Sequence, residues 1–289
     1  MKPAPFDYLA PTSLGQALDA VADHERDVKV LAGGQSLIPV MNLRMGHPEV
    51  LVDICRIPEL QQLSVADDGA LHIGAGVRQA TVLADERTGA GWPLLRAAIR
   101  NIGHPQIRSR GTVCGSLAHA DPAAELPAVA LALGATMVIR SRSGERRVPA
   151  DDFFLAPFTT ALAEDEILVE VVLPAAPVDA GWAFEEFATR RGDFATAGAA
   201  VLLARDGDMV DSGRLTLFGV AGTPIRVLAV EDALMGARVT EHLLATVKAA
   251  VESAVTPSDD VHATGQFRTE IAARLAATTI ERAWERCNG

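Results

Sequence analysis

The stretch KVLAGGQSLIPVMNLRM, Lys29 to Met45, places two adjacent glycines directly after a short apolar run. Residues 28–31 contain two valines and predict a buried strand. A glycine after a strand can adopt a positive φ and lets another backbone or a ligand approach closely. Consecutive amides in such a turn also form an anion site, to which Gln35 and Ser36 would add donors. Taken alone, the segment is explained at least as well by a tight turn that binds nothing.

The segments around these glycines predict alternating strands and helices. A capping-box pattern at Ser13 begins a helix that runs to about Asp23. Ser36 is placed to cap a short helix after the glycines, and residues 49–54 predict a second buried strand. The first sixty residues therefore predict a β–α–β–loop–β opening.

The rest of the chain alternates in the same way and then changes its pattern. We expect a strand from Leu71, a helix over 92–102, a long functional loop over 104–127, a helix through Leu133, a hairpin turning near Ser143 and a strand ending before Pro174. Residues 174–181 have the composition of a linker. Beyond them we expect a strand, a turn at 206–207, a second strand and helices over 227–235, 240–253 and 267–285.

Composition and charge limit the possible functions. The chain has 289 residues, of which 49% are apolar, and a net charge of −11. This predicts two or three globular domains and argues against nucleic acid and anionic lipid as partners. No apolar run is long enough to span a membrane, and the N-terminus lacks the features of a signal peptide. Cys55, Cys114 and Cys287 are scattered without a C-x-x-C motif, which predicts no bound metal and a reducing compartment, most simply the cytoplasm.

A nicotinamide-binding Rossmann domain is the first alternative for the glycine turn. Asp53 ends an apolar strand about twenty residues after Gly33, as the ribose-binding acid of that fold does. However, the motif is Gly-Gly and not G-x-G-x-x-G, and Pro39 and Pro48 interrupt the segment that should form one crossover helix. No Walker motif occurs either. We therefore reject both nucleotide-binding folds.

A second loop rich in small residues follows later in the chain. The segment RGTVCGSLAHADP, residues 110–122, places two glycines, a threonine and a serine within six positions. Two such loops are suited to hold the two phosphates of one dinucleotide.

The pair AGGQSLIP and TVCGSLAHADPAAELP closely resembles the flavoprotein subunit, or medium subunit, of molybdenum hydroxylases. This is the family of aerobic carbon monoxide dehydrogenase and xanthine dehydrogenase. The resemblance covers the whole chain and includes FDYLAPTSLGQAL, PEVLVDI, HPQIRSRG and RRGDFATAGAAV.

The resemblance implies an α+β fold with two domains. Residues 1–176 would form a two-lobed FAD-binding domain of the vanillyl-alcohol-oxidase (PCMH) type, with lobes of about 1–55 and 56–176. Residues 177–289 would form a smaller α+β domain of the carbon monoxide dehydrogenase flavoprotein type, with an antiparallel sheet and helices. FAD would lie extended between the lobes, with its pyrophosphate on the two glycine loops.

Positions that match the family's cofactor contacts can be carried over residue by residue. Glu125 matches an acid at the sugar or ribityl chain, Leu168 an apolar residue near adenine, and Phe184 an aromatic beside the isoalloxazine. His119 and Asp121 lie in the second loop, and for both a structural role agrees with the resemblance as well as direct contact with the cofactor does. The resemblance implies no catalytic residue and no metal ligand in this chain. The cofactor-binding residues it implies are Leu31, Ala32, Gly33, Gly34, Gln35, Ser36, Leu37, Ile102, Gly103, Gly111, Thr112, Cys114, Gly115, Ser116, Glu125, Leu168 and Phe184.

Two positions depart from the family's pattern. Cys114 replaces a glycine that many relatives have, and Ser116 replaces a frequent asparagine. Both keep the backbone donors, so we expect FAD binding to persist. The side chain of Cys114 should point away from the phosphates as a small buried thiol.

The function implied is that of the FAD-carrying electron-transfer subunit of a heterotrimeric hydroxylase. A large molybdopterin subunit and a small subunit with two [2Fe–2S] clusters would be its partners, in a dimer of heterotrimers. Electrons would pass from the clusters through FAD to an external acceptor, and the substrate would be an N-heterocycle, a purine or carbon monoxide. A large and fairly apolar partner interface is expected around residues 104–110 and in the strands of the C-terminal domain. One alternative is a stand-alone FAD oxidase or reductase of the vanillyl-alcohol-oxidase type, for which the short C-terminal domain and 4% aromatic content are unfavourable. A flavin-binding scaffold without enzymatic activity is a third interpretation.

Overall fold

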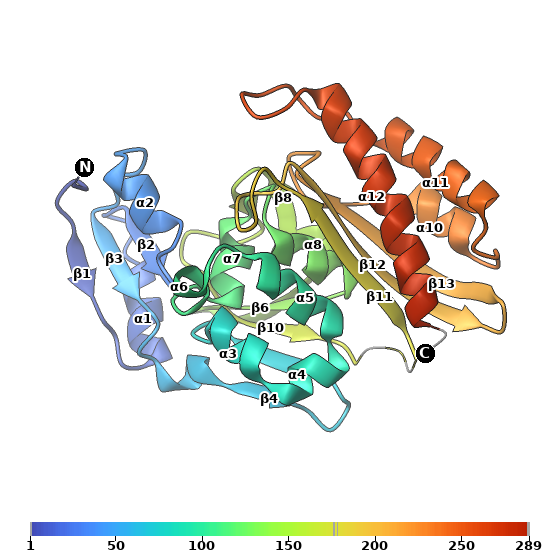
Figure 1. Cartoon of the computed structure of the whole chain (residues 1–289). Coiled ribbons are helices and arrows are strands. Elements are labelled where there is room, and N and C mark those ends of the chain that lie inside the picture. The colour runs from blue at the N-terminus through green and yellow to red at the C-terminus, as the bar shows by residue number, and fades with distance from the viewer. Residues whose placement is uncertain (1, 176, 178, 288–289) are drawn as a thin grey trace.

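The structure is a computed structural model that describes residues 2–175, 177 and 179–287. It combines helices with three main β-sheets, and the chain passes from one sheet to the next without returning (Figure 1). The predicted linker over 174–181 lies partly outside the described residues.

The first sheet is parallel and has the strand order β1–β3–β2. Its central strand is buried along Val50, Leu51 and Val52, as the apolar run predicts. The elements of this part are β1 (Asp7–Leu9), α1 (Leu14–Val21), β2 (Val28–Leu31), α2 (Leu37–Asn42) and β3 (Val50–Asp53).

The N-caps predicted for α1 and α2 differ in outcome. The Ser13 side chain accepts a hydrogen bond from the Gln16 amide at 3.3 Å, so α1 begins where predicted. The Gln16 side-chain oxygen in turn accepts a hydrogen bond from the amide of Thr12 at 2.9 Å. Ser36 occupies the N-cap position of α2, but its side chain makes no capping bond, so that prediction is wrong. The Ser36 hydroxyl is therefore left for another partner.

The second sheet is antiparallel, with the order β4–β5–β10–β6–β7. The predicted 143–144 hairpin joins β6 to β7. Every residue of α8 is buried, because this helix packs between the neighbouring helices α5, α7 and α9 and the third sheet. The elements are η1 (Pro58–Gln61), β4 (Leu63–Val65), β5 (Leu71–Gly74), α3 (Gln79–Ala84), α4 (Glu86–Gly91), α5 (Pro93–Asn101), α6 (Pro105–Arg108), α7 (Val113–His119), α8 (Glu125–Ala132), β6 (Thr136–Ser141), β7 (Gly144–Pro149), α9 (Ala150–Phe153), β10 (Ile167–Leu173) and the small pair β8 (Phe154–Ala156) and β9 (Thr159–Thr160).

Residues 104–127 do not form the long loop that the sequence predicts. They contain α6, α7 and the start of α8. Helix α6 has only four residues, and α7 has seven, several of them small, so neither shows an apolar period that reveals a helix. Their starts are nevertheless marked, by Pro105 in the first turn of α6 and by the Thr112 side chain that caps α7.

The third sheet is antiparallel, with the order β11–β12–β13–β14, and three helices follow it as predicted. The long helix α12 crosses one face of β11 and β12 (Figure 1). A Cβ on Gly181 would lie 1.9 Å from the Ala283 carbonyl oxygen, so only glycine permits this approach. The elements are β11 (Gly181–Phe187), β12 (Ala197–Asp206), β13 (Met209–Phe218), β14 (Ile225–Arg226), α10 (Leu228–Leu234), α11 (Glu241–Ala254) and α12 (Gly265–Arg286).

A buried arginine fastens α12 to the end of the third sheet. Arg268 is 8% exposed and donates to the carbonyl oxygens of Thr196 at 2.6 Å and Gly219 at 3.0 Å. Its other terminal nitrogen donates to Asp260 at 2.5 Å. One guanidinium therefore holds the segment before β12, the segment after β13 and the loop before α12.

Replacing Arg268 with alanine should destabilise the protein by about 2–4 kcal/mol, because one buried and one partly buried carbonyl lose their donor. The measurement is the urea midpoint of unfolding. Arg274→Ala, on the exposed side of the same helix, is the matched control and should change stability by less than about 0.5 kcal/mol. Equal midpoints for the two variants would show that Arg268 is not an anchor.

Candidate functional site

The two glycine segments of the sequence meet in space. A Cβ on Gly33 would lie 2.6 Å from both the carbonyl oxygen of Arg110 and the Cα of Gly111. A Cβ on Gly115 would lie 3.2 Å from the Cβ of Ala32. Because real Cβ atoms do not approach backbone so closely, the loop after β2 and the loop before α7 can touch only through glycine.

The first loop, residues 32–37, presents free backbone donors. Gly34 has φ +71°, which glycine adopts without strain. Among the described residues, no acceptor is found for the amides of 33–37. The Gln35 side chain donates to the Gly33 carbonyl at 3.0 Å, so it braces the loop. Gln35 also lines the cavity, and its role as a donor to a ligand stays a prediction.

The second loop is fixed by its own side chains. The Thr112 hydroxyl accepts from the amide of Gly115 at 3.0 Å and so caps α7. The side chain of Gln79 is buried next to this loop, and its nitrogen donates weakly to the Thr112 carbonyl at 3.4 Å. Its Oε1 atom has no hydrogen-bond partner in the structure. A Cβ on Gly111 would lie 3.0 Å from this oxygen.

Cys114 is a buried thiol, in agreement with the prediction from its sequence position. It is 2% exposed, and its Sγ donates to the Ile73 carbonyl on β5 at 3.5 Å. Burial raises the pKa of the thiol far above its usual range, so no thiolate forms near neutral pH. The side chain therefore points into the core, and the loop keeps its backbone donors.

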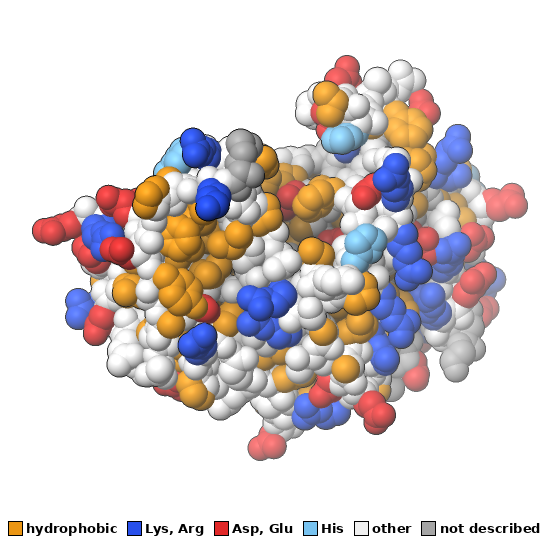
Figure 2. Space-filling view, turned by 60° about the vertical axis from the view of Figure 1, so that its left-hand side comes forward, with side chains coloured by type: hydrophobic (Ala, Val, Ile, Leu, Met, Phe, Trp, Pro, Cys, Tyr) orange, Lys and Arg blue, Asp and Glu red, His pale blue; other side chains and the backbone are white. Residues whose placement is uncertain are grey.

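The loops form one side of a cavity of ≈ 520 Å³, a size typical of sites for small molecules and cofactors. Figure 2 shows the molecule hollowed at its upper middle, with hydrophobic side chains inside. Every cofactor-binding residue implied by the resemblance lines this cavity except Phe184. The lining residues that the sequence reasoning did not assign to the cofactor are Lys29, Val30, Ile54, Ala75, Gln79, Ile107, Ala118, His119, Asp121, Ala124, Leu162, Glu166, Ile167, Gly192, Asp193 and Phe194.

The aromatic side chain at the cavity differs from the one expected. Phe184 is 8% exposed and stacks on Phe218 with ring centroids 5.6 Å apart, inside the core. Phe194 lines the cavity instead, and it is 70% exposed. The motif RRGDFATAGAAV contains Phe194, so the sequence carried the signal that would have found it.

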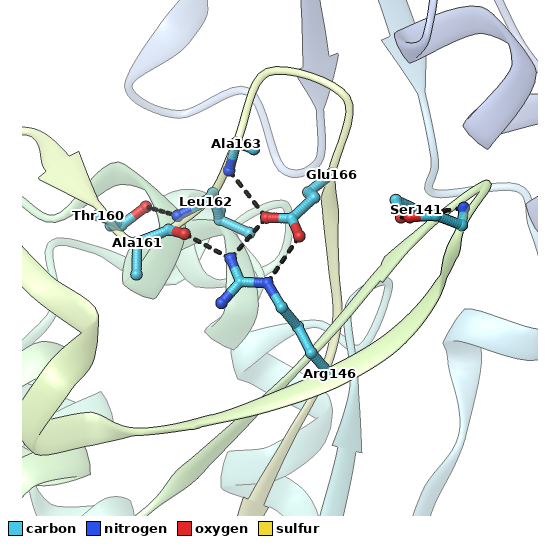
Figure 3. Close-up of polar contacts among 8 residues, drawn as sticks. Ser141, Arg146, Thr160, Ala161, Leu162, Ala163 and Glu166 are labelled. Atoms are coloured by element: carbon cyan, nitrogen blue, oxygen red, sulfur yellow. Dashed lines mark hydrogen bonds and ion pairs between the residues drawn. The ribbon is translucent and has the colours of Figure 1, made fainter.

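One wall of the cavity is held by a bidentate ion pair (Figure 3). The Arg146 guanidinium donates to both carboxylate oxygens of Glu166 at 2.7 and 2.6 Å, and to the Ala161 carbonyl at 2.5 Å. Glu166 also accepts from the amide of Ala163 at 2.8 Å. These bonds close the turn before β10, which brings Leu162 and residues 166–168 to the cavity.

Glu125 is a buried acid at the start of α8. It is 8% exposed, and burial raises the pKa of its carboxyl to about 8, with Glu186 and Asp121 adding repulsion. Burial also raises the pKa of Glu186 to about 7, and its Oε2 has no partner in the structure. Near neutral pH, Glu125 is therefore mostly protonated, and it can both donate and accept a hydrogen bond at the cavity wall.

His119 and Asp121 also line the cavity, but each has a partner within the protein. The His119 ring lies 5.1 Å from that of Phe158, and burial lowers its pKa. Asp121 accepts from the amide of Ala123 at 2.9 Å. In the described part of the chain, no group of three or more His, Cys, Asp and Glu side chains is placed to hold a metal ion.

Comparison with known proteins identifies the family. Residues 4–176 match the FAD-binding domain of molybdopterin dehydrogenases, and residues 182–283 match the C-terminal domain of carbon monoxide dehydrogenase flavoproteins. The chain belongs to this family of molybdopterin-dependent oxidoreductases. The first match contains both glycine loops, and the second contains Phe194.

Relatives in this family match over nearly their whole length. The chain is 42% identical to the caffeine dehydrogenase subunit beta of Pseudomonas sp. strain CBB1, over 99% of this chain and 97% of that one. The structure of carbon monoxide dehydrogenase from Hydrogenophaga pseudoflava has a TM-score of 0.97 and 38% identity, over 99% of this chain and all of that one. Quinoline 2-oxidoreductase from Pseudomonas putida 86 gives 0.94 and 34%, over 99% of both chains. The two-domain α+β fold implied by the resemblance is thereby confirmed.

No helix among the described residues has the length and apolar character needed to cross a membrane.

Gly33→Ala should weaken FAD binding at least about tenfold, or about 1.4 kcal/mol, because its Cβ must push the two loops apart. The readout is the Kd for FAD of the apoprotein, measured by quenching of flavin fluorescence, with circular dichroism to confirm folding.

Gly15→Ala is the control, since a Cβ there meets no atom within 4 Å. It should bind FAD like the wild type. If Gly33→Ala also does so, the contact between the loops is not needed for the site.

Proposed function

We propose that this chain is the FAD-carrying electron-transfer subunit of a heterotrimeric molybdenum hydroxylase. The contact between the loops at Gly33 and Gly111 carries the proposal, because it places the free amides of residues 33–37 along one cavity wall. The family match supports the cofactor, since the matching domain is an FAD-binding domain.

The residues of the cavity fit a dinucleotide. The free amides of 33–37 and the loop of 111–116 are suited to the pyrophosphate. Leu162 and Leu168 offer an apolar surface for adenine beside the Arg146–Glu166 pair. The remaining residues implied by the resemblance would line the path of the cofactor between these points.

The flavin end would lie where residues 102–103 and 192–194 face the cavity. The exposed ring of Phe194 is suited to cover a planar ligand there, a role that we assign to it in place of Phe184. Protonated Glu125 would donate to hydroxyl groups of the sugar or ribityl chain without bringing a buried negative charge near the phosphates.

When bound, FAD supplies a centre that takes and gives electrons one or two at a time. This chain would position it and exclude competing chemistry, and the described residues offer no metal site of their own. A large molybdopterin subunit and a small subunit with two [2Fe–2S] clusters would complete the complex, in a dimer of heterotrimers. The free cysteines support a reducing compartment, for which we propose the cytoplasm.

We propose an N-heterocycle or purine as substrate of the complex, ahead of carbon monoxide. Two of the relatives are named for caffeine and quinoline, both N-heterocycles. We also propose the domain division 1–176 and 177–289, with lobes of about 1–55 and 56–176, which agrees with the three successive sheets.

The isolated FAD-loaded chain should not oxidise caffeine, quinoline, nicotine or carbon monoxide, because the hydroxylating centre lies on another subunit. In the complex with both partners, one of these substrates should bleach first the cluster absorbance and then that of the flavin in a stopped-flow experiment. Turnover of an organic substrate by the isolated chain would instead favour the stand-alone oxidase.

A further inference from the structure

The opening of the cavity is flanked by cations in a chain that is strongly acidic overall. Between Glu86 and Asp121 the sequence has five arginines and two histidines but no Asp or Glu, although the net charge is −11. Arg100 and His104 come from this window, and both are exposed. Arg190 and Arg191 are exposed as well, and they directly precede residues 192–194, which line the cavity. We name these four residues the basic rim.

The rim is brought together by contact between two loops. Gly192 has φ +90°, and a Cβ on it would lie 3.0 Å from the Gly103 carbonyl oxygen and 3.2 Å from Cε1 of His104. This contact sets Arg190 and Arg191 beside the loop that follows α5, whose last turn carries Arg100. Residues of both loops line the cavity, so the rim borders the end at which we place the flavin.

The charge of the rim is not neutralised within the described chain. None of its three arginines takes part in an ion pair. The nearest acid in sequence is Asp193, which is exposed at the cavity, while Glu185 on β11 is engaged by Arg282. Figure 2 shows Lys and Arg side chains gathered to the right of the hollow.

We propose that the basic rim docks the acidic face of a small single-electron carrier protein, which receives electrons from the flavin. The inference rests on the proposed function. The carrier takes one electron per encounter, so two carrier molecules reoxidise one fully reduced flavin, whose two protons pass to solvent.

Charge complementarity is the reason to choose an acidic protein. On a surface with net negative charge, a local positive rim attracts an acidic partner in one orientation and leaves it repelled elsewhere. A small anion would need buried, converging cations, whereas the rim cations are exposed around an opening. A permanent apolar interface, which the sequence suggested for 104–110, also suits this charged surface less well than a transient one.

The test compares two forms of one carrier on the purified complex. The flavin is reduced anaerobically with stoichiometric dithionite, so that the result does not depend on the substrate. The reduced complex is then mixed with native cytochrome c, whose surface is basic, or with succinylated cytochrome c, whose surface is acidic. At low ionic strength the acidic form should be reduced at least about tenfold faster, and at about 0.5 M salt this preference should vanish.

Charge-reversal variants locate the effect. Arg100→Glu and Arg190→Glu should each lower the preference for the acidic carrier about fivefold at low salt. Lys248→Glu is the matched control, because it reverses an exposed, unpaired cation on α11, and it should leave the preference within about twofold of wild type.

Equal rates for both carriers in the wild type would overturn the inference while leaving the proposed function intact. Loss of a partner subunit from the Arg100→Glu or Arg190→Glu complex, or slower electron transfer from the clusters to the flavin, would also overturn it. The rim would then belong to the permanent interface. Failure of the flavin to be reduced by any substrate would instead count against the proposed function.

Discussion

The site depends on a backbone contact between two loops that are far apart in the sequence. Gly33 lies against the carbonyl of Arg110 and the Cα of Gly111, with no room for a side-chain atom. The Arg78 guanidinium donates to the same Arg110 carbonyl, and the amide of Gln79 donates to Gly111 at 2.8 Å. The second loop is thus fixed to the segment after β5, and the first loop closes onto it. Gly33 is therefore needed for the two loops to pack against each other, whether or not a ligand is bound. The packed loops leave the backbone amides of residues 33–37 free at the cavity.

The sequence predicts the elements that have a clear period or cap and fails where those signals are absent. Ser13 begins α1 as its pattern indicates, and the helix predicted over 240–253 is found as α11. The helices within 104–127 do not show in the sequence because α6 has only four residues and α7 is short and contains several small residues, so that no apolar face is visible. Phe184 shows a different limit: it lies outside the quoted motifs, and which aromatic reaches the cavity depends on how β11 packs, with Phe184 stacked on Phe218. Contacts such as Gly192 against His104 join distant loops and have no local signature.

Charge is distributed unevenly around the cavity, and the burial of acidic side chains explains much of this unevenness. Inside, Glu125 is shielded from water and is mostly protonated near neutral pH, so the wall carries less negative charge than its sequence suggests. Glu166 is neutralised by Arg146, which lowers the pKa of its carboxyl. At the opening, the basic rim stays exposed and unpaired. An electron carrier and a dinucleotide phosphate would thus both meet a surface less acidic than the whole protein.

The comparison of FAD with FMN tests most directly whether the closed loops hold a pyrophosphate. Both ligands carry the same flavin and ribityl chain, but only FAD has the pyrophosphate and adenosine. Isothermal titration of the apoprotein should give FAD at least about a hundredfold lower Kd than FMN, or about 2.7 kcal/mol, and ADP should compete with FAD. Equal affinity for FAD and FMN, with no competition by ADP, would contradict the account and place the binding energy elsewhere in the cavity.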